Sequence, residues 1–354
     1  MSTDVAPAKR GLLERLADGP VICAEGYLFE LERRGYLQAG GFVPEVVLEN
    51  PEALAQVHRE FVRAGSDVVE AFTYYGHREK MRLIGKEELL EPLNRQALEL
   101  AHSVAAEVKE EQPLVAANVC NTNVYHPGGQ SDATVRRMFE EQIGWAVDGR
   151  ADLVIGETFY HLGEARLALA AVRQAGLPAV ITLALPAEGV LADGPSAADA
   201  ARVLEQDGAD VVGLNCFRGP ATMMPYLREI RERVSCHVAA MPVPYRTTTE
   251  HPTFFTFADG ASEDAPGARP FPTALEPFLT NRYEVARFAR EAYAVGIRYI
   301  GICCGNAPSY TRAVAEALGR HPEASRYSPD MSKHFAFGTD PSLDKETLEL
   351  APKL

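Results

Sequence analysis

The stretch RYIGICC, residues 298–304, is a short apolar run that ends in two adjacent cysteines and is followed by Gly305. Short runs rich in β-branched residues are typical of strands buried in a parallel sheet. This run is the last of eight along the chain, and segments with a helical pattern lie between them. The alternation predicts repeated strand–helix units around one parallel sheet.

The eight predicted strands extend over most of the sequence. They are residues 20–24, 66–74, 113–119, 151–159, 178–185, 209–217, 236–243 and 298–304. Amphipathic segments between them include 51–65, 132–150 and 281–296. Eight strands, each followed by a helix, favour an α/β fold of the (β/α)8 TIM barrel type, with an open doubly wound sheet as the alternative. The open sheet is the weaker interpretation because no G-x-G-x-x-G motif follows the first strand.

Two segments fall outside this regular pattern. Residues 245–280 follow the seventh strand and are rich in Thr, Pro, Gly and Phe, and a loop of this length is typical of a functional lid or a partner surface. Residues 319–354 are polar, and we expect them to pack over the barrel or to reach a second subunit. The sequence therefore predicts one barrel domain over residues 1–318 and a short C-terminal extension over 319–354.

Composition and charge narrow the choice of partners and compartment. The chain has 354 residues, of which 46% are hydrophobic and 24% charged, as in ordinary globular proteins with a large core. Its net charge of -14 disfavours nucleic acids and anionic membranes as partners, whereas a cationic substrate would not be repelled. The N-terminus has no apolar leader, and no run of about 18 apolar residues occurs. These features predict a cytoplasmic protein.

The cysteine positions favour a metal site over disulfide bonds. Cys216 ends the sixth predicted strand, while Cys303 and Cys304 end the eighth, and the carboxyl ends of barrel strands meet on one face. Three thiolates suit zinc, which keeps a fourth position for water or substrate in catalytic sites. The alternative is that these cysteines are small buried hydrophobes, since adjacent residues of a strand point to opposite faces. A bend at Gly305 would let both sulfurs face one ion. The remaining cysteines are predicted to be packing residues: Cys23, Cys120 and Cys236.

Acidic and aromatic residues are expected on the same face as these cysteines. Glu25 follows the first predicted strand and Glu157 lies near the end of the fourth, where a carboxylate can bind an ammonium group or act in acid–base chemistry. Capping or a surface salt bridge is the alternative for each. Aromatic residues on this face can hold a cation, although such residues are also common in cores. They are Phe42, Tyr74, Tyr75, Phe159, Tyr160 and Phe217.

The motifs at these strand ends resemble those of the zinc-dependent homocysteine S-methyltransferases, and of the betaine-dependent members in particular. The resemblance runs from about Gly11 to Leu318 and resumes in SPDMSKH at 328–334. It rests on GYLFELERRGYLQAG (26–40), EAFTYY (70–75), GLNC (213–216) and GICCG (301–305). The resemblance implies a (β/α)8 barrel with one Zn²⁺ ion bound by Cys216, Cys303 and Cys304.

The same resemblance implies a reaction. A substrate thiol takes the open position of the zinc, which lowers its pKa, and the sulfur attacks the methyl group of a betaine-like quaternary ammonium or sulfonium donor. The implied acceptor is homocysteine and the product methionine. The partners are thus a small-molecule thiol and a cationic methyl donor, and the family implies a homo-oligomer.

Roles for individual residues follow from the resemblance alone. Glu157 matches the carboxylate that holds the homocysteine amino group, and Tyr75 matches a tyrosine that can approach the zinc when substrate is absent. These two are the candidate catalytic residues. The family has Asp-Gly-Gly where this chain has Ala24, Glu25 and Gly26, so Glu25 either substitutes from the next position or marks a different thiol acceptor. The full set of candidate substrate-binding residues is Glu25, Gly26, Phe42, Tyr74, Tyr75, Glu157 and Asn215.

Two other functions stay open. CCGNAP, residues 303–308, forms a glycine-containing loop before a helix, and loops after the last two barrel strands often bind phosphate. No lysine neighbours this loop, which weakens the phosphate hypothesis. The other possibility is a redox or zinc sensor in which Cys303 and Cys304 respond to oxidation.

Overall fold

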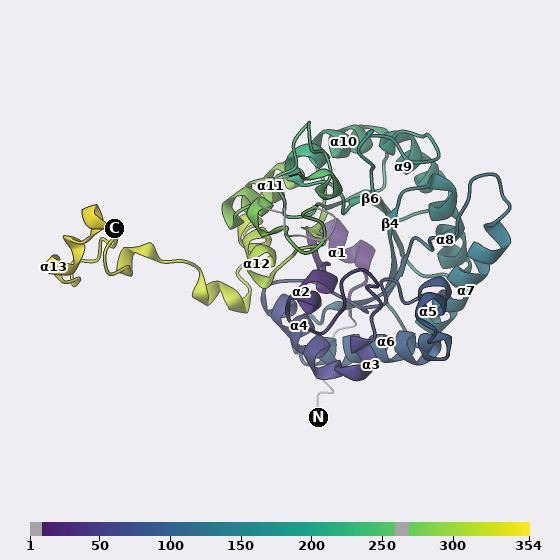
Figure 1. Ribbon diagram of the computed structural model, residues 1–354, viewed down its shortest axis with the longest axis horizontal. Helices are drawn as coiled ribbons and strands as arrows, with labels where there is room; N and C mark the ends of the chain where they lie inside the picture. Colours follow the sequence, from purple (N-terminus) through teal and green to yellow (C-terminus); the bar gives the residue numbers. More distant parts are fainter. Residues whose placement is uncertain (1–8, 259–268) are drawn as a thin grey trace, which may run out of the picture.

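The computed structural model describes residues 9–258 and 269–354, and its eight strands form a closed barrel (Figure 1). The strands are β1 (Val21–Ala24), β2 (Val68–Glu70), β3 (Leu114–Cys120), β4 (Leu153–Phe159), β5 (Ala179–Leu183), β6 (Val211–Asn215), β7 (His237–Met241) and β8 (Tyr299–Ile302). Each strand pairs in parallel with the next, and β8 pairs with β1 to close the ring. The predicted (β/α)8 TIM barrel is confirmed, and the open sheet is excluded.

Helices surround the strands in a ring, apart from α1, which appears inside the ring in this view, and α13, which lies on the C-terminal extension (Figure 1). They are α1 (Leu12–Asp18), α2 (Tyr27–Arg33), α3 (Val46–Glu49), α4 (Pro51–Arg63), α5 (Arg78–Ile84), α6 (Leu90–Ala106), α7 (Asp132–Asp148), α8 (Leu162–Ala175), α9 (Ala197–Gln206), α10 (Pro220–Arg233), α11 (Arg282–Ala294), α12 (Pro308–Ala317) and α13 (Lys345–Leu348). Short 3-10 turns occur at η1 (Glu87–Leu89), η2 (Phe254–Thr256), η5 (Glu276–Phe278), η6 (Glu323–Tyr327), η7 (Met331–Lys333) and η8 (Ala351–Lys353). None of the helices in the described ranges has the length and apolar character needed to span a membrane.

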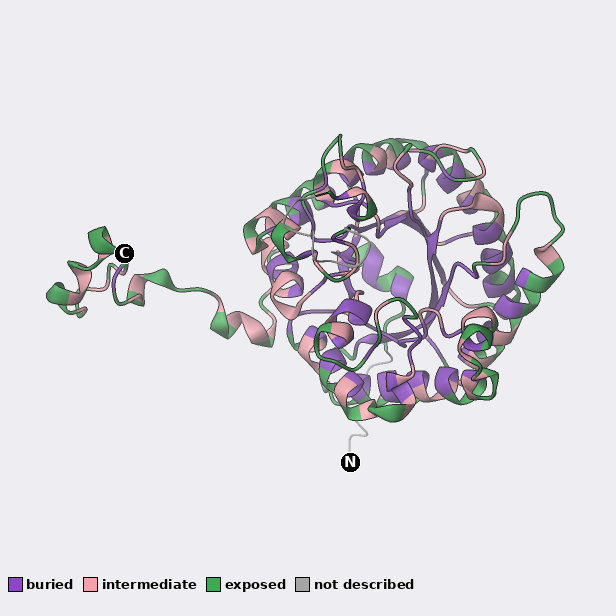
Figure 2. Ribbon diagram, in the orientation of Figure 1, coloured by how far each residue is buried: buried purple, intermediate pink, exposed green. Residues whose placement is uncertain are grey.

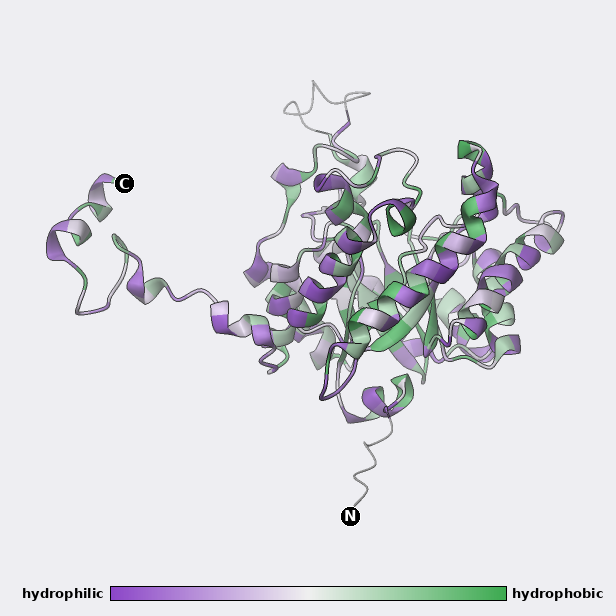
Figure 3. Ribbon diagram, turned by 90° about the horizontal axis from the view of Figure 1, so that it is seen from below, coloured by the Kyte–Doolittle hydropathy of each residue, from purple (hydrophilic) through white to green (hydrophobic). Residues whose placement is uncertain are grey.

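The core lies between the strands and the inner faces of the helices (Figure 2). All residues of β3 and β4 are buried, as expected for parallel strands covered by helices. In α4 the buried residues Leu54, Val57 and Phe61 recur at helical spacing, so one face of the helix packs inward. Figure 3 shows the same division, with hydrophobic strands inside helices of mixed hydropathy.

An aspartate immediately precedes β2, β4 and β6 and ties each to the strand before it. The sequence shows this repeat as SDVV, ADLV and ADVV. The carboxylate of Asp67 accepts a hydrogen bond from the backbone N–H of Ile22 (2.7 Å). In the same way, Asp152 accepts from the N–H of Val115 (2.7 Å) and Asp210 from the N–H of Ala179 (2.8 Å). The repeat therefore holds neighbouring strands in register at the amino end of the barrel.

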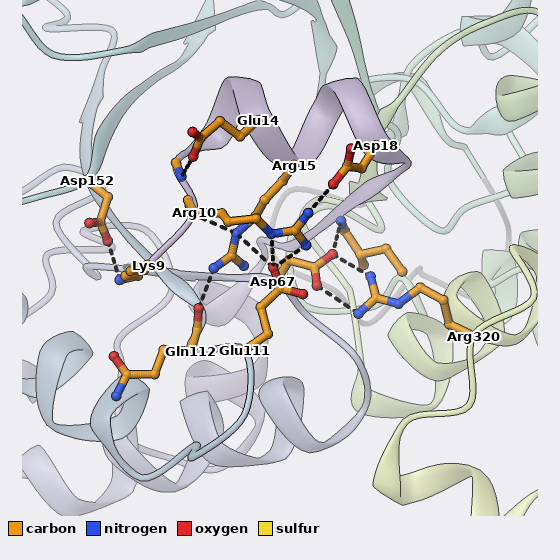
Figure 4. A network of polar contacts seen from close by, with 12 residues as sticks. Lys9, Arg10, Glu14, Arg15, Asp18, Asp67, Glu111, Gln112, Asp152 and Arg320 are labelled. Carbon is orange, nitrogen blue, oxygen red and sulfur yellow. Dashed lines mark hydrogen bonds and ion pairs between the residues drawn. The ribbon is translucent and has the colours of Figure 1, made fainter. Parts of the chain in front are cut away.

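A charged network lies beneath the barrel beside α1 (Figure 4). Arg320, which follows α12, forms an ion pair with Asp67, and its Nη2 donates to Oδ1 at 2.7 Å. Arg15 of α1 donates to the carbonyl of Gln112 at 2.6 Å. Because Asp67 precedes β2, its pairing with Arg320 links the first strands of the barrel to the end of its last helix.

The long loop after β7 packs on the barrel through aromatic side chains. Part of the predicted segment 245–280, residues 259–268, lies outside the described residues. The buried ring of Phe254 has its centroid 4.9 Å from that of Phe271 and 6.4 Å from that of Phe29 in α2. The loop thus covers part of the carboxyl end of the barrel, and its role as a lid stays a prediction.

The C-terminal extension projects away from the barrel (Figure 1). Near the barrel, the guanidinium of Arg63 lies 5.5 Å from the ring centroid of Tyr327. Further along, Met331, Phe335 and Phe337 are exposed. Packing on the barrel therefore holds only for the first part of the extension, and the domain boundary after residue 318 stays a prediction.

Candidate functional site

Three cysteine sulfurs converge at the carboxyl end of the barrel. The Sγ atoms of Cys216, Cys303 and Cys304 all lie within 4.8 Å of one another. Cys216 and Cys303 are buried, Cys304 is half-buried, and all three are free thiols. Three sulfurs at this separation can ligate one tetrahedral metal ion.

The two adjacent cysteines reach the same point because neither belongs to a strand. β8 ends at Ile302, and the alternation of side chains applies only within a strand. The N–H of Cys303 donates to the carbonyl of Pro242 at 2.9 Å, and its own carbonyl accepts from the N–H of Asn306 at 2.9 Å. With Gly305 at a φ of 92°, this turn brings both sulfurs to one side.

The backbone at three strand ends adopts a conformation that is costly for residues with a side chain. Cys216 has a φ of 54° and Phe217 of 53°, while Thr158 and Tyr75 each have a φ of 60°. Such left-handed positions cost on the order of 1–3 kcal/mol each and cluster at functional sites. Here they follow β6 and β2 and coincide with a register shift in β4. The strained positions thus include one of the three clustered cysteines, Cys216, and the residue that follows Glu157.

The three thiols ionise unequally. Burial disfavours the charged form of Cys216, but hydrogen bonds from the thiols of Cys303 and Cys304 outweigh burial and lower the pKa of Cys216 to about 6. The pKa of Cys303 is raised well above its usual value, first by burial and then by its hydrogen bond to Cys216. The pKa of Cys304 is raised mainly by its hydrogen bonds to the other two cysteines. A bound cation would favour the thiolate form of all three.

Two buried carboxyl groups adjoin the sulfurs. One oxygen of Glu25, one of Glu157 and the Sγ of Cys303 lie within 4.8 Å of one another. Burial and the charge of Cys303 raise the pKa of Glu157 to about 8, and burial with the charge of Glu157 raises that of Glu25 well above its usual value. Neither oxygen of Glu25 has a hydrogen-bond partner among the residues described. The pair is thus suited to receive a cationic group.

Two asparagines hold Glu157 in place from opposite sides. Asn215 Nδ2 donates to Oε2 of Glu157 at 2.8 Å, and its Oδ1 accepts from the N–H of Thr158 at 2.9 Å. Asn118 Nδ2 donates to Oε1 of Glu157 at 2.7 Å and to Oε1 of Glu70 at 2.6 Å. Neither Glu70 nor Asn118 was predicted from the sequence. The sequence feature that could have identified them is a polar residue in an otherwise apolar, buried strand. Glu70 is that residue in β2, and Asn118 is that residue in β3.

A cavity of about 20 Å³ lies beside the sulfurs and carboxyl groups. Two of the residues predicted to bind substrate, Tyr74 and Gly26, line it, and their role stays a prediction. The full lining is Gly26, Tyr27, Leu28, Glu70, Ala71, Phe72, Tyr74, Asn118, Glu157, Cys303 and Cys304. The cavity is thus lined by two of the three clustered cysteines, by two carboxyl groups and by one of the predicted aromatic side chains.

The other predicted aromatic residues lie outside this cavity. Tyr75 packs against Tyr74 with ring centroids 4.4 Å apart, and the Nζ of Lys80 lies 4.0 Å from the centroid of Tyr75. Phe42 is buried against Phe29, with centroids 6.1 Å apart. Phe159, expected at the barrel mouth, instead packs in the core against Phe139 of α7, so that expectation is wrong. The remaining two predicted aromatic residues also pack against other rings: Phe217 contacts Phe255, and Tyr160 contacts His161.

The loop after β8 shows no feature that singles out phosphate. The N–H of Ala307 at the start of α12 donates to Oδ1 of Asn306 at 2.8 Å. This amide is therefore already satisfied within the loop. The geometry favours a metal and cation site over the phosphate hypothesis.

Comparisons with known proteins agree with this geometry. The family model for homocysteine S-methyltransferase matches residues 22–318. Betaine–homocysteine S-methyltransferase 1 from Xenopus tropicalis is 36% identical over 339 residues, which cover 94% of this chain and 81% of that protein. S-methylmethionine–homocysteine S-methyltransferase from Pongo abelii is 34% identical over 346 residues, covering 96% of this chain and 89% of that protein.

A solved structure shares the fold. The homocysteine methyltransferase MmuM from Escherichia coli, in its metallated form, superposes with a TM-score of 0.68 at 20% sequence identity. The match covers 85% of this chain and 98% of that one. It supports the same barrel architecture over nearly the whole of that protein.

Proposed function

The chain belongs to the homocysteine S-methyltransferase family, and we propose on that basis that it is an enzyme that moves a methyl group from a quaternary ammonium or sulfonium donor to homocysteine. Methionine is the product with this acceptor. The observation that carries the proposal is the group of three sulfurs, all within 4.8 Å of one another, beside a buried carboxyl pair. A thiol other than homocysteine is the alternative acceptor, because Ala24 and Glu25 replace the Asp-Gly of related enzymes.

The proposed cofactor is Zn²⁺, bound by Cys216, Cys303 and Cys304. The donor set fits because three sulfurs, two of them buried, face one point and favour a soft, tetrahedral ion. Such an ion supplies an open position at which a thiol ionises near neutral pH while remaining nucleophilic. The homocysteine methyltransferase MmuM from Escherichia coli, which shares the fold, has been solved in a metallated form, and this supports the proposal of a bound metal.

The chain's own residues would bind and orient the acceptor. Glu157, fixed by Asn118 and Asn215, is proposed to accept hydrogen bonds from the acceptor's ammonium group. Glu25 faces the same point from the end of β1, so it would substitute from the next position for the family's missing aspartate. Gly26 allows the chain to pass close to Cys303. Binding in this arrangement would hold the sulfur in line with the donor methyl group.

Aromatic side chains would bind the donor at the rim. Tyr74 lines the cavity, and Tyr75 packs against it. The ammonium of Lys80 above the face of Tyr75 indicates that this ring can accept a cation. In the transfer, a bond forms between the acceptor sulfur and the methyl carbon. The bond from that carbon to the donor's nitrogen or sulfur breaks, its electron pair stays on the donor, and the acceptor proton has already passed to solvent.

Metal analysis and a thiol-methylation assay test the proposal together. Purified protein should contain about one zinc per chain and convert homocysteine to methionine with betaine, dimethylsulfoniopropionate or S-methylmethionine as donor. Protein without zinc that methylates no thiol with any donor would contradict it. If the protein methylates only a thiol other than homocysteine, the proposed methyl-transfer reaction stands and the proposed acceptor is wrong.

The C-terminal extension is proposed to contact a second copy of the chain. Its exposed Met331, Phe335 and Phe337 lie beyond the part that packs near Arg63. Apolar side chains gathered on a projecting segment are typical of an interaction site. Sedimentation analysis of the full chain and of a chain ending at residue 328 tests this. A shorter chain with an unchanged oligomeric state would contradict it.

A further inference from the structure

A buried asparagine follows the two adjacent cysteines. Asn306 is fully buried and comes two residues after Cys304. Asparagine is mostly a surface residue, and burying its amide costs free energy unless the polar atoms are hydrogen-bonded. Both polar atoms of the Asn306 side chain have partners. These partners indicate what the buried amide contributes to the site.

The amide of Asn306 extends the pairing of β8 with β1 beyond the ends of the two strands. The last pair of the ladder is Ala24 with Ile302, and the N–H of Glu25 still donates to the carbonyl of Ile302 at 3.3 Å. Beyond that point, the carbonyl of Glu25 accepts from the Nδ2 of Asn306 at 3.2 Å. A side chain thus bonds β1 where the backbone after β8 has already turned away.

The same side chain also bonds the start of α12. Its Oδ1 accepts from the N–H of Ala307 at 2.8 Å. Its Nδ2 donates to the hydroxyl of Thr311 at 3.2 Å, and this threonine is buried in the first part of α12. The amide of Asn306 is therefore fixed between the end of β1 and the beginning of α12.

These bonds hold the turn that carries Cys303 and Cys304. The backbone N–H of Asn306 donates to the carbonyl of Cys303 at 2.9 Å, and the N–H of Cys303 donates to the carbonyl of Pro242 at 2.9 Å. Both of these bonds use backbone atoms, so they do not depend on the residue type at position 306. The bond to the carbonyl of Glu25 does, because it needs a side-chain N–H at this position.

The third sulfur belongs to a different part of the barrel wall. Cys216 follows β6, and its N–H donates to the carbonyl of Met241 in β7 at 3.0 Å. Loss of the anchor to β1 would let the turn shift relative to Cys216 and would move the sulfurs of Cys303 and Cys304 together. Such a shift changes the distances and angles among all three sulfurs, on which tetrahedral coordination depends.

We propose that Asn306 is a positioning residue of the metal site. By joining the end of β1 to the start of α12, it sets where two of the three clustered sulfurs lie. Asn306 acts through the turn and supplies no ligand atom of its own. The inference rests on the proposed function, because it concerns the proposed ligands of the zinc ion.

Two substitutions test this role. Asn306→Asp keeps the shape of the side chain and the acceptor for Ala307 but removes the donor to Glu25, whereas Asn306→Ala removes both. In each variant the Kd for Zn²⁺, measured by competition with a chelator, should rise about 10- to 100-fold, as is usual when a residue that supports metal ligands is lost. The visible absorption bands of the Co²⁺-substituted protein report coordination geometry and should change as well. Folded variants with the Kd and the bands of the wild type would overturn the inference.

A matched control separates positioning from a general loss of stability. Asn281 precedes α11 as Asn306 precedes α12, and its Oδ1 accepts from the N–H groups of Tyr283 at 2.9 Å and Glu284 at 3.0 Å. Asn281→Ala should lower the urea midpoint of unfolding, because a helix cap is lost, and leave the Kd for Zn²⁺ and the Co²⁺ bands unchanged. An equal loss of Zn²⁺ affinity in Asn281→Ala and Asn306→Ala would overturn the positioning role.

Failure of the inference can be told apart from failure of the proposed function. Wild-type protein that binds no zinc and methylates no thiol contradicts the function itself. Wild-type protein that binds zinc and methylates a thiol, while both Asn306 variants bind zinc equally well, contradicts only the inference. The chelator and Co²⁺ measurements need no substrate, so their outcome does not depend on which acceptor or donor the enzyme uses.

Discussion

Gly26 lies directly against the backbone of Cys303. A β carbon at Gly26 would come within 2.5 Å of the Cys303 carbonyl oxygen, and Gly26 has a φ of 88°. Any side chain at this position would therefore push the turn that carries two of the three sulfurs. The contact joins the end of β1 to the end of β8, so the geometry of the sulfur cluster depends on a residue from the opposite end of the barrel sequence.

Gly26→Ala should impair the metal site more than it impairs the fold. We expect zinc content to fall and kcat/KM to drop about tenfold or more, because a small ligand displacement disturbs tetrahedral coordination. Metal analysis and initial rates measure these effects. Gly35→Ala is the matched control, since Gly35 also has a positive φ of 78° but no atom within 4 Å of the added carbon. Equal zinc loss in the two variants would show that the contact with Cys303 does not matter.

Replacing any one of the three clustered cysteines should abolish metal binding. Cys216→Ser, Cys303→Ser or Cys304→Ser removes one of the three proposed protein ligands, so we expect activity to fall about 100-fold or more. Zinc content per chain and methylation rate are the measurements. Cys236→Ser is the control, because Cys236 lies just before β7 at the opposite end of the barrel. Full zinc occupancy in all three variants would rule out the assigned ligands.

The ion pair between Asp67 and Arg320 should stabilise the closed barrel. Asp67→Ala removes this pair and also the bond from the N–H of Ile22, so we expect a loss of roughly 2–3 kcal/mol in the free energy of unfolding. Asp210→Ala removes the equivalent bond from Ala179 and should cost roughly 1 kcal/mol. Urea titrations give both values.

A double-mutant cycle separates the ion pair from the rest of the Asp67 effect. Arg320→Ala combined with Asp67→Ala should destabilise the protein by less than the sum of the single changes. Strict additivity would show that the two side chains do not stabilise each other. The zinc content of every variant serves as a check that the distant metal site is intact.

Acid should destabilise the fold through buried His58. Burial and the charge of Arg59 lower the pKa of His58 to about 3, and both ring nitrogens lack partners among the described residues. The unfolded state, with a pKa near 6.5, then binds more protons between pH 6.5 and about 3. This contribution is fully present above pH 6.5 and is lost at up to about 1.4 kcal/mol per pH unit as the pH falls.

The His58→Leu variant should show a shallower loss of stability over this pH range. Urea unfolding at several pH values, with a chelator present in every sample, measures the slope without a contribution from zinc release. His77, whose pKa is lowered to about 4 mainly by burial, remains in the variant and leaves part of the slope. An identical slope in wild type and variant would exclude His58 as a source of acid sensitivity.

The barrel was predictable because each strand is a short apolar run that remains buried on both faces. All eight strands of the structure lie within or within one residue of their predicted ranges. The largest difference is β2, predicted to extend to residue 74 and found to end at Glu70. Beyond it the chain turns, and Tyr75 adopts a left-handed backbone that propensity alone does not indicate. Tyr75 consequently lies beside the cavity rather than in its wall.

The sulfur cluster was predictable from strand order, whereas the buried carboxyl network was not. Cys216 and Cys303 follow strands that are close in any eight-stranded barrel. Glu70 and Asn118 meet because the register of β2 on β3 places their side chains in contact, at a distance of 2.6 Å between Oε1 and Nδ2. The register depends on how whole strands pair. The sequence around two isolated polar residues 48 positions apart therefore does not indicate that they are in contact.

The placement of two of the proposed ligands, Cys303 and Cys304, after the last strand has a consequence for how the protein is made. During synthesis, seven strands leave the ribosome before Cys303 and Cys304, and the barrel cannot close until β8 pairs with β1. A complete trio of sulfurs thus arises only after the eighth strand has been synthesised. Metal uptake at the proposed site would then require that β8 has been made, because products that end before it lack two of the three proposed ligands.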